Sequence, residues 1–307
     1  MTVFTRLLVP LDGSTLAESA LSAVVALSRR LPADVTLYHA VERSAPATVH
    51  GDRHLTHPAE AEGYLAGVVA WLGERGVAAR TRSDADAGDV ASRIAAAASR
   101  EGADLVVLCT HGSGGLRRVL FGRVAQQVLQ RGTVPVLLVP PSAAGREQVF
   151  RCRRILVPLD GSQTAEVAIP VASSMAAGFE AEVVLAMVVP TVDTISGERA
   201  AAARLMPTAA AAVLDAEATE AADYLTSAAG RLTARDALVH TTVERGEPVR
   251  TLLGIAATRD ADLIVMATHG RSGVGAVWAG SVAQRLIAQS TKPVLLVRIP
   301  PGDLAIG

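Results

Sequence analysis

The chain has 307 residues, with 29 basic and 30 acidic side chains and a net charge of −1. A chain without net positive charge lacks the field that attracts nucleic acid or an acidic membrane surface, so neither is an expected partner. Hydrophobic residues make up 50% of the sequence and aromatic residues only 3%, so the core must consist of Ala, Val, Leu and Ile. This composition is typical of helices packed on a buried parallel sheet.

The N-terminal segment and the two cysteines indicate the compartment. Residues 1–6 contain no apolar signal region, and no apolar run approaches the roughly 18 residues that span a bilayer. Cys109 and Cys152 are too few for a disulfide framework. Cys109 lies within an apolar segment, where a small core residue is expected rather than a redox sensor. We therefore expect a cytoplasmic protein.

Apolar periodicity divides the first half of the chain into alternating strands and helices. Strands are predicted at 7–11, 35–41, 77–83, 104–110 and 134–139, and helices at about 14–28, 58–75, 89–100 and 122–131. Strands separated by helices are parallel and joined by right-handed crossovers, so this order predicts a doubly wound α/β sheet. Residues 140–145, rich in proline and small residues, form the expected linker.

The second half of the chain repeats the first. The seven residues 8–14 (LVPLDGS) return at 156–162, THG at 110–112 returns at 268–270, and PVLLV at 135–139 returns at 293–297. The offset grows from 148 to 158 residues, so about ten extra residues lie within the second copy, after Pro190 and before an Ala-rich helix at about 208–231. The repeat predicts two α/β domains, at 1–143 and 150–300, with second-copy strands at 155–159, 183–189, 237–243, 263–268 and 294–297.

A carboxylate follows the first strand of each copy. Asp12 and Asp160 come directly after an apolar strand, and each precedes a glycine that lets the chain turn sharply. Open α/β sheets bind ligands beyond the carboxyl ends of their strands, so these side chains stand where a ligand is expected. They could hold ribose hydroxyls or a phosphate-bound metal ion, or serve only as turn formers.

A glycine-ended loop follows the fourth strand, from Gly112 to Gly122 and from Gly270 to Gly280. Backbone N–H groups of such a loop and the helix that starts at its end favour a phosphate chain. Ser281 adds a hydroxyl donor in the second copy. The same glycines could merely serve turns and close packing. Neither a P-loop nor a G-x-G-x-x-G dinucleotide fingerprint is present.

Together these motifs resemble the universal stress protein family. LVPLDGS, THG, GSVA at 280–283 and KPVLLV at 292–297 carry the resemblance, which covers nearly the whole chain as a tandem pair. It implies an adenine nucleotide alpha hydrolase-like fold, with five-stranded parallel sheets of order 3-2-1-4-5 and helices on both faces. It also implies ATP, with or without Mg, as a non-covalent ligand, and pairing of the two domains through their last strands. A homodimer and an unknown protein partner are compatible with it.

The family's nucleotide-binding members carry G-x2-G-x9-G-[ST]. The second copy departs from this pattern at Ala267, and the first copy departs at Cys109 and at Arg123, which replaces the hydroxyl residue. Carried over position by position, the resemblance implies nucleotide contacts at Pro158, Asp160, Val188, Ala267, Gly270, Gly280, Ser281 and Val282, and in the first copy at Pro10, Asp12, Ala40, Cys109, Gly112, Gly122, Arg123 and Val124.

The expected function is a stress-response switch, in which ATP orders the loop after the fourth strand and changes partner contacts. Catalysis would need a positioned water and a second group beside His111 or His269, and the sequence shows no such pair, so at most weak ATPase activity is expected. One alternative is a slow ATP hydrolase or phosphotransferase on the same site. Another is a nucleotide-free dimerisation scaffold, which the departures from the glycine pattern keep open.

Three histidines precede the second helix. On a helix, His50, His54 and His57 would share one face, as in a metal site. Gly51 and Pro58 argue against a helix there, so we expect a mobile, solvated loop over the nucleotide pocket.

Overall fold

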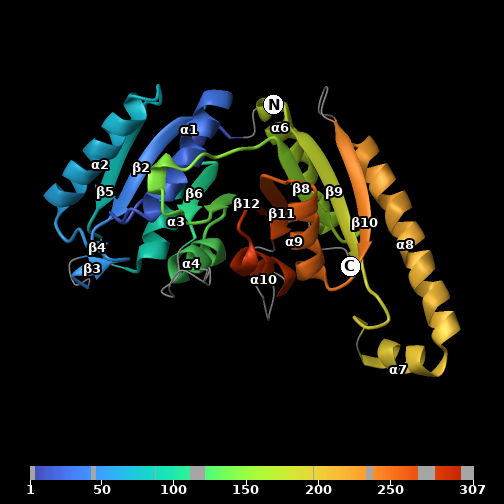
Figure 1. Ribbon diagram of the computed structural model, residues 1–307. Helices are drawn as coiled ribbons and strands as arrows, with labels where there is room; N and C mark the ends of the chain where they lie inside the picture. The colour runs from blue at the N-terminus through green and yellow to red at the C-terminus, as the bar shows by residue number, and fades with distance from the viewer. Residues whose placement is uncertain are drawn as a thin grey trace. The chain divides into compact units, whose positions relative to one another are not determined.

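The computed structural model describes residues 4–42, 46–86, 88–110, 122–195, 197–232, 238–268 and 281–298. These residues divide into two compact units (Figure 1). Unit 1 contains the described residues up to 151 together with 287–298, and unit 2 contains 152–268 together with 281–286. In these ranges no helix is long and apolar enough to cross a membrane.

Unit 1 is an α/β sheet that follows the predicted alternation. Its elements are β1 (Arg6–Pro10), the 3-10 helix η1 (Ala17–Ala20), α1 (Leu21–Arg30), β2 (Asp34–Ala40), β3 (Thr48–Val49), β4 (Asp52–Arg53), α2 (Pro58–Gly73), β5 (Ala79–Asp84), α3 (Val90–Arg100), β6 (Leu105–Cys109), α4 (Arg123–Arg131), β7 (Val136–Val139), the 3-10 helix η2 (Gly145–Glu147) and β12 (Val294–Arg298). The parallel strands lie in the order β5-β2-β1-β6-β7. The predicted order 3-2-1-4-5 is confirmed for the first repeat.

Unit 2 repeats this pattern. Its elements are β8 (Arg154–Leu159), α5 (Gln163–Glu166), α6 (Ala168–Phe179), β9 (Glu182–Val189), α7 (Gly197–Leu205), α8 (Pro207–Gly230), β10 (Val239–Arg245), α9 (Pro248–Thr258) and β11 (Leu263–Thr268), followed by α10 (Ser281–Gln289). The strands run parallel in the order β10-β9-β8-β11. The long helix α8 lies along the edge strand β10 (Figure 1).

The last strands of the two repeats pair with each other. In β12, Val294, Leu295 and Leu296 lie opposite 136–138 of β7, and the two strands are antiparallel. All the paired residues are buried. Backbone groups at a buried sheet edge must find partners, and each of these strands supplies them to the other. The resemblance implied this pairing, and the tandem arrangement fits it.

Apolar side chains on both faces of the central strands form the core. Leu8 and Val9 of β1 and Val107 of β6 are fully buried, as are Ile155 and Leu156 of β8. Parallel strands buried on both faces read as continuous apolar runs, which is why the sequence identified them. In unit 1, α2 packs on β5 and β2, while α3 packs on β2 and β1.

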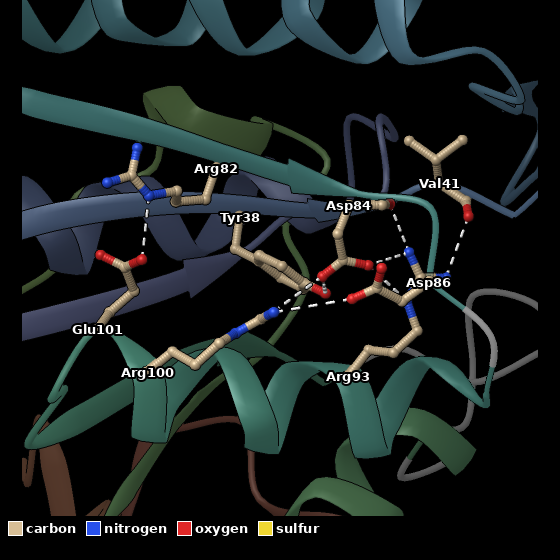
Figure 2. A network of polar contacts seen from close by, with 8 residues as sticks. All are labelled: Tyr38, Val41, Arg82, Asp84, Asp86, Arg93, Arg100 and Glu101. Carbon is tan, nitrogen blue, oxygen red and sulfur yellow. Dashed lines mark hydrogen bonds and ion pairs between the residues drawn. The ribbon is translucent and has the colours of Figure 1, made fainter.

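A buried ion pair joins β5 to α3 (Figure 2). The Arg93 side chain is 6% exposed; its Nε donates to Asp84 Oδ1 at 2.7 Å, and its Nη1 donates to the Val41 carbonyl at 3.0 Å. Tyr38 of β2 donates its hydroxyl to Asp84 Oδ2 at 2.6 Å. Burial alone would raise the pKa of Asp84, but the hydrogen bonds from Tyr38 and Arg93 and the charge of Arg93 outweigh it and hold this pKa below its usual value.

We expect Asp84→Ala to lower the free energy of unfolding by about 3 kcal/mol, because it leaves a buried guanidinium without its partner. Urea denaturation at neutral pH measures this. Asp86→Ala is the matched control. The Asp86 side chain is exposed, and its Oδ2 makes a long contact of 3.7 Å with Arg100 Nη1, so this variant should change the free energy of unfolding by less than about 0.5 kcal/mol.

The stability that the ion pair between Asp84 and Arg93 contributes depends on pH. Because folding lowers the pKa of Asp84, the ionised carboxylate contributes fully to the free energy of unfolding at pH values above its unfolded pKa of 3.8. This contribution is lost as the pH falls through the folded pKa. Equal stability of wild type and Asp84→Ala at neutral pH would show that the pair does not stabilise the fold.

Candidate functional site

The turn after the first strand has the same hydrogen bonds in both repeats. Asp12 Oδ1 accepts from the Ser14 backbone N–H at 2.9 Å and from the Ser14 hydroxyl at 2.6 Å. Ser14 Oγ in turn accepts from the N–H of Ala17, the first residue of η1, at 3.1 Å. Residues 160–162 repeat the Asp–Ser bonds, at 3.0 and 2.5 Å. One oxygen of each aspartate therefore holds the turn.

A cavity of about 550 Å³ lies in unit 1 at this edge of the sheet. Seven of the eight first-copy residues proposed from the sequence line it, and the eighth, Gly112, lies outside the described residues. The seven are Pro10, Asp12, Ala40, Cys109, Gly122, Arg123 and Val124. They come from the carboxyl ends of β1, β2 and β6 and from the start of α4. Parallel strands deliver their carboxyl ends to one edge, which is why residues distant in sequence meet here.

The start of α4 faces this cavity. Gly122 is its N-cap and provides no side-chain acceptor for the first N–H groups of the helix. Arg123 and Val124 follow in the first turn, and both are exposed. The N-terminus of a nine-residue helix and a guanidinium thus stand on one side of the cavity, where they favour an anion.

The remaining wall contains residues that the sequence did not single out. Apolar side chains of Val90 and Ile94 come from α3, and Leu108 comes from β6. His39, on β2, also lines the cavity. The hydrophobic pattern placed these residues on a strand or a helix, but it could not show which helix crosses the sheet beside β2. Of these four residues, only His39 could have been noticed in the sequence, because it is a polar residue in an apolar strand.

A short hairpin, β3–β4, covers the turn at Asp12. His50 Nε2 lies 3.7 Å from Asp12 Oδ2, and the Asp52 carboxylate accepts from the Thr15 N–H at 2.7 Å. His54 is buried, with Nε2 3.7 Å from a Glu42 oxygen.

The segment is exposed over much of its length, as expected, since His50, Gly51 and Arg53 are exposed. The segment lies over the cavity as expected, since Val49, His50 and His54 line it, but it is paired as antiparallel strands and His54 is buried. His57 is exposed at the N-cap of α2. No group of three metal-ligating side chains that could hold a metal ion occurs in the described part of the chain.

Cys109 is a buried member of the cavity wall. Burial, and secondarily the charge of Asp12, raises the pKa of its thiol. The expectation that Cys109 is a small buried residue of the apolar strand is confirmed.

The second-repeat candidates are described only in part. Pro158 and Asp160 lie at and just after the end of β8, Val188 in β9 and Ala267 in β11, all near the carboxyl ends of parallel strands. Asp160 is exposed, and its Oδ1 is engaged by Ser162. Gly270 and Gly280 lie outside the described residues, as do His111, His269 and the side chain of Ser281. Val282 follows Ser281 in the first turn of α10.

Fold and cavity together define a doubly wound α/β protein with a cavity at the carboxyl edge of its parallel strands. The universal stress protein family model matches residues 4–140 and 151–298, one match for each repeat. The chain belongs to the universal stress protein family, as a tandem member.

Relatives and solved structures agree with this membership. A universal stress protein of Mycolicibacterium smegmatis is 31% identical over 199 residues, which span 64% of this chain and 62% of that protein. Another, from Methanocaldococcus jannaschii, is 30% identical over 148 residues, covering 48% of this chain and 83% of that protein. The crystal structure of a universal stress protein from Archaeoglobus fulgidus superposes with a TM-score of 0.69 at 20% identity, covering 95% and 98% of the two chains, and so shares the fold.

The central glycines of the two turns, Gly13 and Gly161, differ in how closely other side chains approach them. Gly13 has φ +88°, and a Cβ there would lie 2.8 Å from Leu55 Cδ1. Gly161 has φ +84° in the second repeat, but its Cβ would meet only Met187 Cε, at 3.8 Å. Both alanine variants are strained by the left-handed backbone, whereas only Gly13→Ala must also displace Leu55.

We expect Gly13→Ala to be more destabilising than Gly161→Ala, by about 1 to 3 kcal/mol in urea unfolding. A double-mutant cycle with Leu55→Ala should recover part of this difference, because it removes the clashing side chain. Additive effects of Gly13→Ala and Leu55→Ala would contradict the packing of Leu55 on this turn.

Proposed function

We propose that the chain binds an adenine nucleotide, ATP in the cell, at the cavity of unit 1 and at the corresponding edge of unit 2. The observation that supports it most is the convergence of seven residues, proposed from sequence alone, around one cavity. The domains proposed for this role are 1–143 and 150–300, and the proposed setting is the cytoplasm.

The chemistry of the cavity suits such a ligand. Its volume of about 550 Å³ lies within the 300–1,000 Å³ that small-molecule sites span. Val90, Ile94 and Leu108 offer an apolar wall for a flat base. Asp12 stands at the carboxyl end of β1, where a carboxylate can accept from ribose hydroxyls. Arg123 and the start of α4 would face phosphates, with or without Mg²⁺.

The proposed role is a switch rather than a reaction. A ligand that contacts the end of β1, the β3–β4 hairpin and the start of α4 at once favours the arrangement in which all three are in place. Binding can shift the protein between states only by the difference in affinity for those states. Partner proteins would respond to the state of this surface in a stress response.

Isothermal titration with Mg-ATP, together with mass spectrometry of nucleotide released on denaturation, tests the proposal. We expect up to two equivalents per chain. Asp12→Asn and Asp160→Asn should each weaken one of them by about tenfold, because an amide binds ribose hydroxyls less well than a carboxylate and a tenfold change corresponds to about 1.4 kcal/mol. Asparagine can still accept from the Ser14 or Ser162 N–H, so the turn is kept.

Asp34→Asn is the matched control, since Asp34 is exposed at the amino end of β2, on the opposite edge of the sheet. It should leave binding unchanged. A chain that binds no nucleotide would support the scaffold alternative instead. Phosphate release that is linear in protein and abolished by Asp160→Asn would favour the slow hydrolase.

A further inference from the structure

His39 is a buried polar residue in the cavity wall of unit 1. Its side chain is 1% exposed, and it lies in β2 between Tyr38 and Ala40, which also line the cavity. Nδ1 lies 2.7 Å from the backbone carbonyl of Leu11. Nε2 is buried and has no hydrogen-bond partner among the described residues.

The contact with Leu11 fixes the tautomer of this imidazole. A carbonyl oxygen only accepts, so Nδ1 must carry the hydrogen and donate it. In the neutral ring Nε2 then has no hydrogen and presents a lone pair. A buried acceptor without a partner costs about as much as a lost hydrogen bond, so a group that donates to it is favoured.

The second repeat lacks this acceptor. Pro10 pairs with Tyr38 in unit 1, and Pro158 pairs with Ala186 in unit 2, so His39 corresponds to Met187. A thioether is at most a weak acceptor. The two repeats therefore differ at this strand position in the chemistry that the side chain can offer to a ligand.

We propose that His39 is a specificity-determining residue of unit 1, whose Nε2 accepts a hydrogen bond from an N–H or O–H group of the bound nucleoside. The inference rests on the proposed function, since it assigns a contact within that binding site. The donor is the exocyclic amine of the purine or a ribose hydroxyl. The site in unit 2 makes no such selection.

Two substitutions separate the two nitrogens of the ring. In His39→Asn the side-chain amide can replace Nδ1 as the donor to Leu11, but nothing replaces Nε2. In His39→Gln the amide oxygen can replace Nε2 as an acceptor, while the bond to Leu11 is lost. We expect the asparagine variant to keep the bond to Leu11 and bind Mg-ATP at unit 1 about tenfold more weakly, and the glutamine variant to lose that bond and bind normally.

Three analogues identify the donor. Purine riboside triphosphate lacks the exocyclic amine, and 2′-deoxy-ATP and 3′-deoxy-ATP each lack one hydroxyl. Wild type should bind one of the three about tenfold more weakly than ATP at unit 1, and His39→Asn should no longer distinguish that analogue from ATP. Titrations use the full chain with Asp160→Asn, so that the site in unit 2 is weakened.

Nitrogen NMR of the histidine rings gives a readout that needs no variant to fold. His39 Nε2 should appear unprotonated in the free protein and shift on addition of Mg-ATP. If ATP binds while this resonance stays fixed and His39→Asn keeps wild-type ligand preference, the inference is wrong and the proposed function stands. If wild type binds no nucleotide, both are wrong.

Discussion

The hydrogen bonds from Ser14 to the Asp12 carboxylate are the interaction on which the site of unit 1 depends. They hold a tight turn after β1, place Ser14 to accept from the first N–H of η1, and fix a carboxylate at the edge of the cavity. The turn needs a left-handed backbone at its centre, which glycine supplies. Residues 160–162 repeat this arrangement, so the duplication preserved a geometry and not only a sequence.

Around this shared turn the two units have diverged. In unit 1 the pair between Asp84 and Arg93 fixes the end of β5 against α3, beside the cavity. By strand register Asp84 corresponds to Glu244, and by distance from the helix cap Arg93 corresponds to Thr251. A threonine cannot form that ion pair, so the contact between β5 and α3 has no counterpart at these two positions of the second repeat. The units are therefore not interchangeable copies of one site.

The strands could be predicted from short apolar runs. Of the proposed residues that line the cavity, Asp12 and Gly122 followed from the pattern of strand end and loop, and the others were implied by the family resemblance. Continuous apolar runs mark strands buried on both faces, and the ends of parallel strands must meet at one edge. The hairpin at 48–53 could not be predicted, because two-residue strands carry no periodicity. Nor could the bond between His39 and Leu11, since it depends on the register of β1 and β2. The pair between Asp84 and Arg93 depends in the same way on how α3 lies over β5.

The pairing of β12 with β7 ties the first unit to a segment made much later. Residues 294–298 follow β7 by more than 150 positions, which ribosomes take roughly 8 to 30 s to translate. During that time β7 is an open, apolar edge strand, the kind of surface that recruits other strands. The first unit can therefore complete its sheet only after residues 294–298 have been made, and until then the edge of β7 is open to mispairing.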